Sequence, residues 1–414
     1  MKNKTTKKTT KLMKWIIVAG LIFSANLNSA THTVTNGNDN GAGSLRQIAF
    51  DAGDGDTILF ASNVSEVNLT SCEIWIYNNL TIIGGSDTTR KVTINGNNSR
   101  IFWIEGFFTV NINNLILING YASTSNTLVG GGAIYIICAT LTATNCIFYK
   151  NSAMDMPGSV IYLDYFSVFI AINCTFVQNS TNNNSGAIHI RSKSTAYLYH
   201  CTIDNNVENG ISNNNLLYAY NCVFTGNTLN QIQGTVSGGS NLIEGENGVT
   251  RDLVFGNNTL TDSGYIMPLE YAKSAPRLTA NDIEVPAGFS ADSIISWLYA
   301  DQRGKIRPDS GLVTFGAVEY DESSIKELGL LIATSIYPNP TTDYFTVSFE
   351  LEKPCNLEIL LYDVLGREIL EIHNGFTVEG LFIKKIDVDK LVSGVYFIKI
   401  SIDNDYIIKK ITIN

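Results

Sequence analysis

The segment NCIFYKN at residues 145–151 recurs three times downstream, and this repetition decides the fold of the chain. The other copies are NCTFVQN (173–179), HCTIDNN (200–206) and NCVFTGN (221–227). In each copy a cysteine is followed two residues later by Phe or Ile and five residues later by Asn. Successive cysteines are 28, 27 and 21 residues apart. Repeats of this length with internal alternation are typical of a solenoid.

A second marker precedes each cysteine, and it reads GAIYI (132–136), GSVIYL (158–163), GAIHI (186–190) and GIS (210–212). Alternate residues of a strand face the same side, so Cys and the following Phe or Ile share one face. One turn cannot bury that face alone, but turns stacked about 4.8 Å apart can. We therefore predict an all-β fold, a right-handed parallel β-helix with strands over about 56–260. An all-β sandwich is the alternative.

The repeated cysteines and asparagines have different expected roles. The chain has seven cysteines, so at least one is free. We interpret the four repeat cysteines as small buried residues stacked on one another, with disulfide pairing between neighbours as the alternative. We expect the recurrent asparagines at a corner, because Asn bonds to nearby backbone and tolerates left-handed dihedrals. These asparagines are Asn151, Asn179, Asn206 and Asn227.

A short helix is predicted before the first strand of the solenoid. Ser44 is a good N-cap, and LRQIAFDA (45–52) places Leu45, Ile48 and Ala49 on one helical face. Gly53 and its neighbours then end the helix. We expect this helix to cap the open end of the first turn.

The stretch before this helix is similar to a calcium loop. Asn36, Asn38, Asn40 and Gly41 have the spacing of such a loop, but the carboxylates that bind calcium are missing from it. We interpret the stretch as a turn, and C-x-x-C spacings typical of zinc sites are absent. No metal and no cofactor are therefore predicted.

The first thirty residues have the pattern of a secretory signal peptide. Six lysines and no acid precede or flank the apolar run 15–23, and Ala25 and Ala30 are alternative cleavage positions. An uncleaved anchor is the other interpretation, although the run is too short to span a bilayer, and no later segment is longer. Removal of residues 1–30 lowers the net charge from −10 to −16, which argues against nucleic acid as a partner.

The C-terminal segments TVSF, EILLY, FIKKI, VYFIKI and YIIKKITI alternate and are separated by turn residues, which predicts a small antiparallel β-sandwich over 335–414. This region resembles the sorting domain of the type IX secretion system of the Bacteroidetes. The residues that carry the resemblance include Pro338, Asn339, Pro340, Gly366, Gly394, Lys409 and Lys410.

The resemblance to the sorting domain implies an address and a partner. It implies passage through the periplasm and the outer membrane, with the secretion translocon as partner, to a secreted or cell-surface location. The domain would then be removed or exchanged for an anchor. We place the linker at 321–334 and the β-helix domain, including its cap, at 31–320.

The central region also resembles a known group of proteins. The segments GSLRQIAFDAGDGDTILF (43–60), GGAI (131–134), FYKN (148–151) and DQRGKIRPDSGLVTFGAVEY (301–320) are similar to bacterial right-handed β-helix surface proteins. These include the choice-of-anchor domain proteins and, more distantly, polymorphic outer-membrane proteins. The resemblance implies surface display with adhesion or glycan interaction.

Pectate lyases and polygalacturonases share this pectate-lyase-like solenoid, so catalysis is an alternative. Arg191 and Lys193 match the Arg-x-Lys element of the pectin hydrolases, but His189 is not flanked by glycines. Glycoside hydrolysis needs two carboxylates about 5–9.5 Å apart. The best carboxylates within the repeats, Asp164 and Asp204, do not align in phase. The catalytic candidates are Asp164, Arg191 and Lys193.

The phase of the repeat suggests a binding face instead. If Ile134, Ile161 and Ile188 point inward, the residues that follow them point outward as an exposed row beside charged groups. Sugar C–H groups stack on such rings while hydroxyls bond to charged side chains. The alternative is a row of paired rings with a surface Asp164–Arg191 ion pair. The ligand-binding candidates are Tyr135, Tyr162, His189 and Arg191.

These features are compatible with three functions. The first is adhesion or binding of extracellular polysaccharide, with a glycan or a host or cell-surface ligand as partner. The second is a polysaccharide lyase or glycoside hydrolase acting on acidic or plant and algal glycans. The third is a structural component of the surface layer.

Overall fold

The structure is a computed structural model. It describes residues 29–85, 90–124, 129–261, 266–308, 312–320, 334–351, 354–363, 367–402 and 405–414. The expected linker, apart from Thr334, and nearly all of the expected signal peptide lie outside these residues, as does Gly366.

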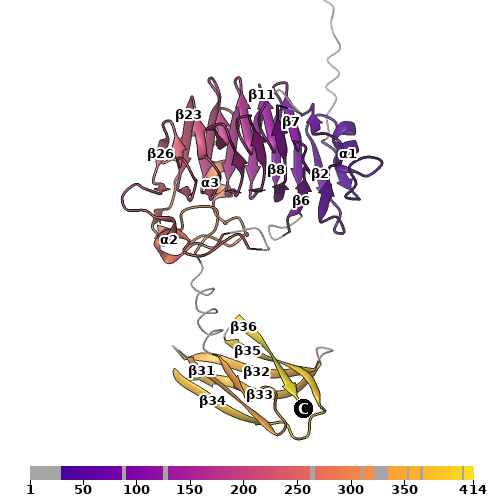
Figure 1. Ribbon diagram of the computed structural model, residues 1–414, viewed down its shortest axis with the longest axis vertical. Coiled ribbons are helices and arrows are strands. Elements are labelled where there is room, and N and C mark those ends of the chain that lie inside the picture. Colours follow the sequence, from indigo (N-terminus) through magenta and orange to yellow (C-terminus); the bar gives the residue numbers. More distant parts are fainter. Residues whose placement is uncertain are drawn as a thin grey trace, which may run out of the picture.

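The N-terminal part is a parallel β-helix, whose successive turns contribute strands to three long sheets (Figure 1). Nine strands form the first of them, sheet A. They are, in order, β1 (Thr31–Val34), β2 (Asp56–Phe60), β5 (Leu80–Ile83), β8 (Thr109–Asn113), β12 (Thr140–Thr144), β16 (Val168–Ile172), β20 (Thr195–Tyr199), β23 (Leu216–Tyr220) and β26 (Ser237–Gly239).

Four strands of sheet B begin directly after the cysteine of a repeat. The sheet has eight strands in all. They are β3 (Glu66–Asn68), β6 (Val92–Asn95), β9 (Leu115–Ile118), β13 (Ile147–Tyr149), β17 (Thr175–Val177), β21 (Thr202–Asp204), β24 (Val223–Thr225) and β27 (Leu242–Ile243).

Sheet C has seven strands, and a three-stranded sheet precedes it in the middle turns. Sheet C comprises β4 (Ile74–Ile76), β7 (Phe102–Glu105), β11 (Ile134–Ile137), β15 (Ile161–Asp164), β19 (Gly186–Ile190), β22 (Asn209–Asn213) and β25 (Ile232–Gln233). The short sheet comprises β10 (Tyr121–Ser123), β14 (Ser152–Met154) and β18 (Ser180–Thr181).

All strand pairs in this part are parallel and in register, so the predicted solenoid is confirmed and the sandwich alternative is wrong. The predicted limits of about 56 and 260 are wrong at both ends. The strand at 31–34 already pairs with β2, and the last solenoid strand ends at Ile243. The described residues after Ile243 turn back over the outer surface and add no further turn.

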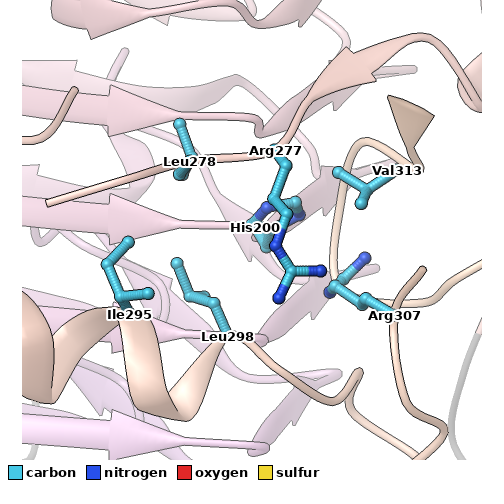
Figure 2. A pocket seen from close by; sticks show the side chains of 7 residues that line it. All are labelled: His200, Arg277, Leu278, Ile295, Leu298, Arg307 and Val313. Atoms are coloured by element: carbon cyan, nitrogen blue, oxygen red, sulfur yellow. The ribbon is translucent and has the colours of Figure 1, made fainter. Parts of the chain in front are cut away.

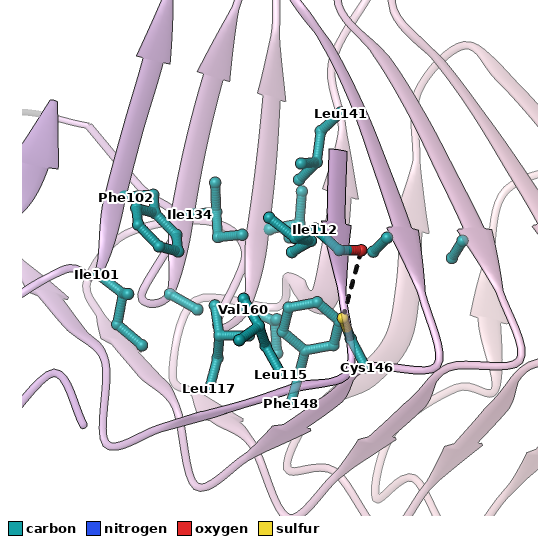
Figure 3. Packing of buried hydrophobic residues seen from close by; sticks show 14 of the residues in the cluster. Ile101, Phe102, Ile112, Leu115, Leu117, Ile134, Leu141, Cys146, Phe148 and Val160 are labelled. Carbon is teal, nitrogen blue, oxygen red and sulfur yellow. Dashed lines mark hydrogen bonds between the residues drawn. The ribbon is translucent and has the colours of Figure 1, made fainter. Parts of the chain in front are cut away.

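The repeat cysteines form the expected internal stack. Cys146, Cys174, Cys201 and Cys222 are fully buried and free. The backbone bonds that join successive turns place each one beside the next, as from Thr175 N to Cys146 O. Figure 3 shows Cys146 with Phe148 in the apolar interior, where its thiol donates to the carbonyl oxygen of Ile112. Burial raises the pKa of the Cys146 thiol well above its usual value.

The recurrent asparagines form a second buried stack, which we call the asparagine ladder (Asn151, Asn179, Asn206 and Asn227). The Asn179 side chain donates to Phe148 O (3.0 Å) and to Asn206 Oδ1 (2.9 Å). Its own Oδ1 accepts from the backbone and side-chain nitrogens of Asn151. The expected left-handed backbone belongs to the preceding residue in each turn, as at Gln178 with φ of 53°. The asparagine side chains therefore point inward and form hydrogen bonds with the backbone groups at the corner.

The predicted N-terminal cap is confirmed as helix α1 (Leu45–Asp51). The Ser44 hydroxyl accepts from Gln47 N, and Leu45 and Ala49 are buried in the same core as the first strands. The preceding stretch is a turn, in which Asn36 Nδ2 donates to Ala42 O and Asn36 Oδ1 accepts from Asn38 N.

The chain after β27 covers sheets A and B from outside. It forms α2 (Arg251–Val254), η1 (Glu270–Ala272), β28 (Ala275–Pro276), α3 (Ala291–Trp297) and β29 (Leu312–Val313). Phe255 and Ala275 pack on sheet B residues such as Val223. Ile294 and Leu298 pack on Tyr199 and its neighbours of sheet A.

The motif at 301–320 attaches this covering segment to the solenoid. The buried Arg307 pairs with Glu319 (2.8 Å) and donates to Asn173 Oδ1 at a solenoid corner (3.1 Å). Gln302 accepts from Thr175 Oγ1 and donates to Cys146 O. These bonds fix the segment across several successive turns.

The C-terminal part is an antiparallel sandwich of two sheets around one apolar core, as predicted (Figure 1). One sheet has the order β30 (Ser335–Tyr337), β31 (Tyr344–Leu351), β34 (Gly380–Asp387). The other has the order β33 (Glu368–Thr377), β32 (Cys355–Asp363), β35 (Gly394–Ile402), β36 (Asp405–Ile413). Among the described residues, no helix has the length and apolar character needed to span a membrane.

Candidate functional site

The outward positions of sheet C carry a row of five neighbouring rings, which we call the aromatic ladder (Trp75, Trp103, Tyr135, Tyr162 and His189). The register pairs each ring with the next along the sheet, as the phase of the repeat predicts. The centroids of Trp75 and Trp103 are 4.4 Å apart with nearly parallel planes. Those of Tyr135 and Tyr162 are 5.7 Å apart.

The expectation that these tyrosines are exposed is wrong. Tyr135 is 3% exposed and Tyr162 is 8% exposed. Tyr135 lies between Trp103 and Tyr162, and the Arg100 guanidinium lies 5.7 Å from its ring centroid. The Tyr135 hydroxyl donates to Asp164 Oδ2 at 3.1 Å. Burial, reinforced by Asp164, raises the pKa of Tyr135 well above its usual value.

This packing limits what the ladder does. Tyr135 and Tyr162 each lie between two neighbouring rings and are almost fully buried, so a sugar has no free face of either ring to stack on. Trp75 and Tyr77, at the N-terminal end of the sheet, are more exposed. We infer that the inner rings support the surface rather than contact a ligand.

His189 ends the aromatic ladder and is mostly enclosed. Its Nδ1 lies 3.0 Å from the Ser185 hydroxyl, and its ring centroid lies 5.4 Å from that of Tyr162. Burial, together with the Arg191 charge, lowers the pKa of His189 to about 4. The ring is therefore neutral at pH 7 and is part of the packing.

Asp164 and Arg191 form the predicted ion pair, with 2.9 Å between Arg191 Nη1 and Asp164 Oδ1. The carboxylate is buried, while the Arg191 side chain is partly in solvent. The Arg191 guanidinium also lies 4.9 Å from the ring centroid of Tyr165. Asp164 is thus held by two neighbours, Arg191 and Tyr135.

The turn from sheet C to sheet A carries the most exposed rings in this region. We call it the edge row (Phe107, Tyr165 and Phe166, with Arg191 and Lys193 beside them). Phe107 is 83% exposed, Phe166 is 61% exposed and Tyr165 is 42% exposed. Lys193 Nζ lies 5.1 Å from the ring centroid of Phe166. Backbone bonds from Phe107 N to Cys138 O and from Cys138 N to Tyr165 O align the turns.

The backbone of the edge row is unusual for bulky residues. Phe107 has φ of 65° and Phe166 has φ of 52°. Left-handed backbone costs about 1–2 kcal/mol for an L-residue. The same corner is left-handed at Cys138 and Lys193, so this turn of the solenoid requires the conformation. A glycine would fit these positions without that cost, so the rings are held outward despite it.

Sequence reasoning missed the edge row and the two tryptophans. The tryptophans had a signal, because EIWI (73–76) and IFWI (101–104) place Trp where GAIYI (132–136) places Tyr. The edge row had only the adjacent aromatic pairs in EGFF (105–108) and DYFS (164–167).

The carboxylates singled out for catalysis do not converge. Asp164 lies on sheet C, whereas Asp204 lies on sheet B and pairs with Arg251 at 2.8 Å. Each carboxylate is bound to an arginine, and they face different sides of the solenoid. Lys193 lies over Phe166 and not beside a second acid. Within the described ranges, no group of three or more His, Cys, Asp or Glu side chains is arranged to hold a metal ion.

The residues of the sorting signal lie on the sandwich. Asn339, between Pro338 and Pro340, donates from Nδ2 to Lys410 O and accepts from Thr412 N. Gly394 begins β35, and Lys409 and Lys410 lie on β36. The segment 334–341 is thereby attached to the last strand.

Comparison with known families identifies one part of the chain. Residues 335–414 match the family model described as a secretion system C-terminal sorting domain. A search of curated proteins finds no match to this chain. The chain therefore combines a parallel β-helix with a sorting domain of the type IX secretion system. This tail indicates secretion to the cell surface or the extracellular space.

Proposed function

We propose that this protein binds extracellular polysaccharide at the surface of the cell and that the edge row is its contact surface. The observation that carries the proposal is the row of exposed rings held outward on left-handed backbone. Contiguous exposed apolar surface marks interaction sites, and strained backbone conformations cluster at functional sites.

The spacing of the edge row suits a linear ligand. Phe107 and Tyr165 are joined through Cys138 and are thus two turns apart, or about 10 Å along the axis. A polysaccharide lying along the axis would meet a ring at each of these levels. The charged ends of Arg191 and Lys193 supply hydrogen-bond donors for hydroxyl or acidic groups.

The protein surface around the row supports the same proposal. The covering segment packs on the outer sides of sheets A and B, and the cores that it forms contain no residue of sheet C. The rigid solenoid and the aromatic ladder already hold the exposed rings in place in the free protein. Binding therefore does not have to order these rings, which lowers the entropic cost of association.

A glycan array with the secreted chain tests the proposal. We expect retention of a polysaccharide by the wild type and at least about tenfold weaker binding by Phe107→Ala/Phe166→Ala, a loss of about 1.4 kcal/mol or more. Phe50→Ala is the matched control, because Phe50 is 74% exposed on the cap helix and lies outside the row.

Three results would overturn the proposal. Equal binding by the double variant at equal stability would remove the edge row as the contact surface. Release of unsaturated uronates or reducing sugars at catalytic rates would assign the chain to the lyases or hydrolases instead. Retention of no glycan at all would favour a structural role in the surface layer.

A further inference from the structure

A small cavity lies between the solenoid and the covering segment, about 10 Å³ in volume, which is the space of one water molecule or one small ion (Figure 2). His200 reaches it from a solenoid corner, and Arg277 and Arg307 reach it from the covering segment. Four aliphatic side chains complete the wall, and none of the described residues that line it is acidic.

Two buried nitrogen atoms of the lining side chains have no hydrogen-bond partner. They are Nδ1 of His200 and Nε of Arg307, on side chains that are 2% exposed. The carbonyl groups of Thr314 and Gly316 accept from the Nη atoms of Arg307. They also lie close to the His200 ring, but His200 Nδ1 makes no bond of hydrogen-bond geometry to either. An unpaired buried donor costs about 1–3 kcal/mol, so two of them at one cavity call for an acceptor.

The tautomer of His200 makes Nδ1 a donor. The Asn221 side-chain nitrogen lies 3.2 Å from His200 Nε2 and also donates to Pro276 O. Because an amide nitrogen only donates, Nε2 must accept and Nδ1 must carry the hydrogen. Burial, together with the Arg307 charge, lowers the pKa of His200 well below its usual value, so the ring is neutral.

The lining favours an anion over water. A water molecule must donate two hydrogen bonds of its own, and the lining side chains offer arginine and histidine donors and aliphatic groups but no acceptor. A halide accepts from every donor and needs no acceptor in return. Arg277 adds a second guanidinium, which also donates to Pro308 O and lies over the Tyr299 ring.

We propose that this cavity is a binding site for a single halide ion, held by His200 Nδ1 and Arg307 Nε. The ion joins a corner of the solenoid to the 301–320 segment, which carries Arg307. It therefore acts as a structural link that keeps the covering segment on sheets A and B. This site lies apart from the edge row and does not depend on the proposed glycan function.

Thermal unfolding of the full chain tests the site, with sodium chloride compared to sodium gluconate at equal ionic strength. We expect the β-helix transition to lie about 2–4 °C higher in chloride, because an ion that binds only the folded state stabilises it. His200→Gly removes the donor and suits the backbone, because His200 has φ of 49°, a left-handed conformation that glycine adopts without strain. In this variant the shift should disappear.

His373→Asn, in the sandwich, is the control and should keep the chloride shift. Diffraction from wild-type crystals soaked in sodium bromide gives a second readout that needs no variant. We expect an anomalous peak between His200 and Arg307. Equal transitions of the wild type in the two salts, or a bromide-soaked cavity without an anomalous peak, would overturn the proposal.

Discussion

The outer faces of sheets A and C both carry rows of neighbouring aromatic rings, but the covering segment packs on that of sheet A. On sheet A the rings of Tyr199 and Tyr220 stack at 5.5 Å, and the covering segment buries them. The Tyr199 hydroxyl donates to Glu284 O of that segment. On sheet C the aromatic ladder leads to a turn whose rings lie in solvent. Stacked rings alone therefore do not mark a site, and the absence of a cover is the informative difference.

Both faces are built on one shared scaffold, and the largest effect is expected there. Asn179→Ala should lower the free energy of unfolding by about 3–5 kcal/mol, because it leaves buried backbone groups of Asn151 and Phe148 without partners. Urea denaturation measures the loss. Asn257→Ala, at an exposed position, is the control and should cost no more than about 0.5 kcal/mol. Similar losses of stability in the two variants would contradict the role of the asparagine ladder.

The covered face should be next in sensitivity. Tyr199→Ala should cost about 3–4 kcal/mol, because it empties a fully buried ring position and removes the bond to Glu284. Tyr77→Ala, at the exposed end of sheet C, should cost less than about 1 kcal/mol. Chemical denaturation of the two variants compares them directly. Equal costs would show that sheet C is covered as well.

The outer face of sheet C also carries a group whose protonation should change the stability of the protein, His189. His189 has a folded pKa of about 4, below its usual value of about 6.5, so the unfolded chain takes up the proton first. The stability that the neutral His189 ring contributes to the folded state is complete above pH 6.5 and is lost as the pH falls toward 4. Over this pH range the free energy of unfolding of the wild type should fall by about 2–3 kcal/mol more than that of His189→Gln. This figure follows from about 1.4 kcal/mol per unit of pKa difference. Parallel pH profiles of unfolding would contradict this assignment.

The smallest effect on stability is expected at the edge row. Phe166→Gly removes the left-handed penalty of Phe166 and adds the entropy cost of glycine, so the free energy of unfolding should change by no more than about 0.5 kcal/mol. Binding of the retained polysaccharide should nevertheless weaken about tenfold. A large loss of stability with unchanged binding would show that the ring is structural.

The core of the solenoid was predictable because its signal is local and repeated. Cys146 and Phe148 stand two residues apart in the sequence, and the alternation of a strand alone places both inside. The sandwich was predictable for the same reason. The left-handed corner was misplaced by one residue, because either Gln178 or Asn179 satisfies the turn pattern and only the inner hydrogen bonds distinguish them.

The candidate site was predictable only in part. The register that brings Tyr135, Tyr162 and His189 together follows from the repeat. The burial of Tyr135 does not, because it depends on Arg100 from the preceding turn and on Asp164 from the next. The cover on sheets A and B comes from a segment without repeats, so the sequence contains no pattern that places it.

Hydroxyl-radical footprinting of the wild type, with and without the polysaccharide retained on the array, tests the edge row as the contact surface most directly. We expect protection of Phe107, Tyr165 and Phe166 on binding, with no change at Tyr199 or Tyr220. Protection at another face, with the edge row as reactive as in the free protein, would contradict it.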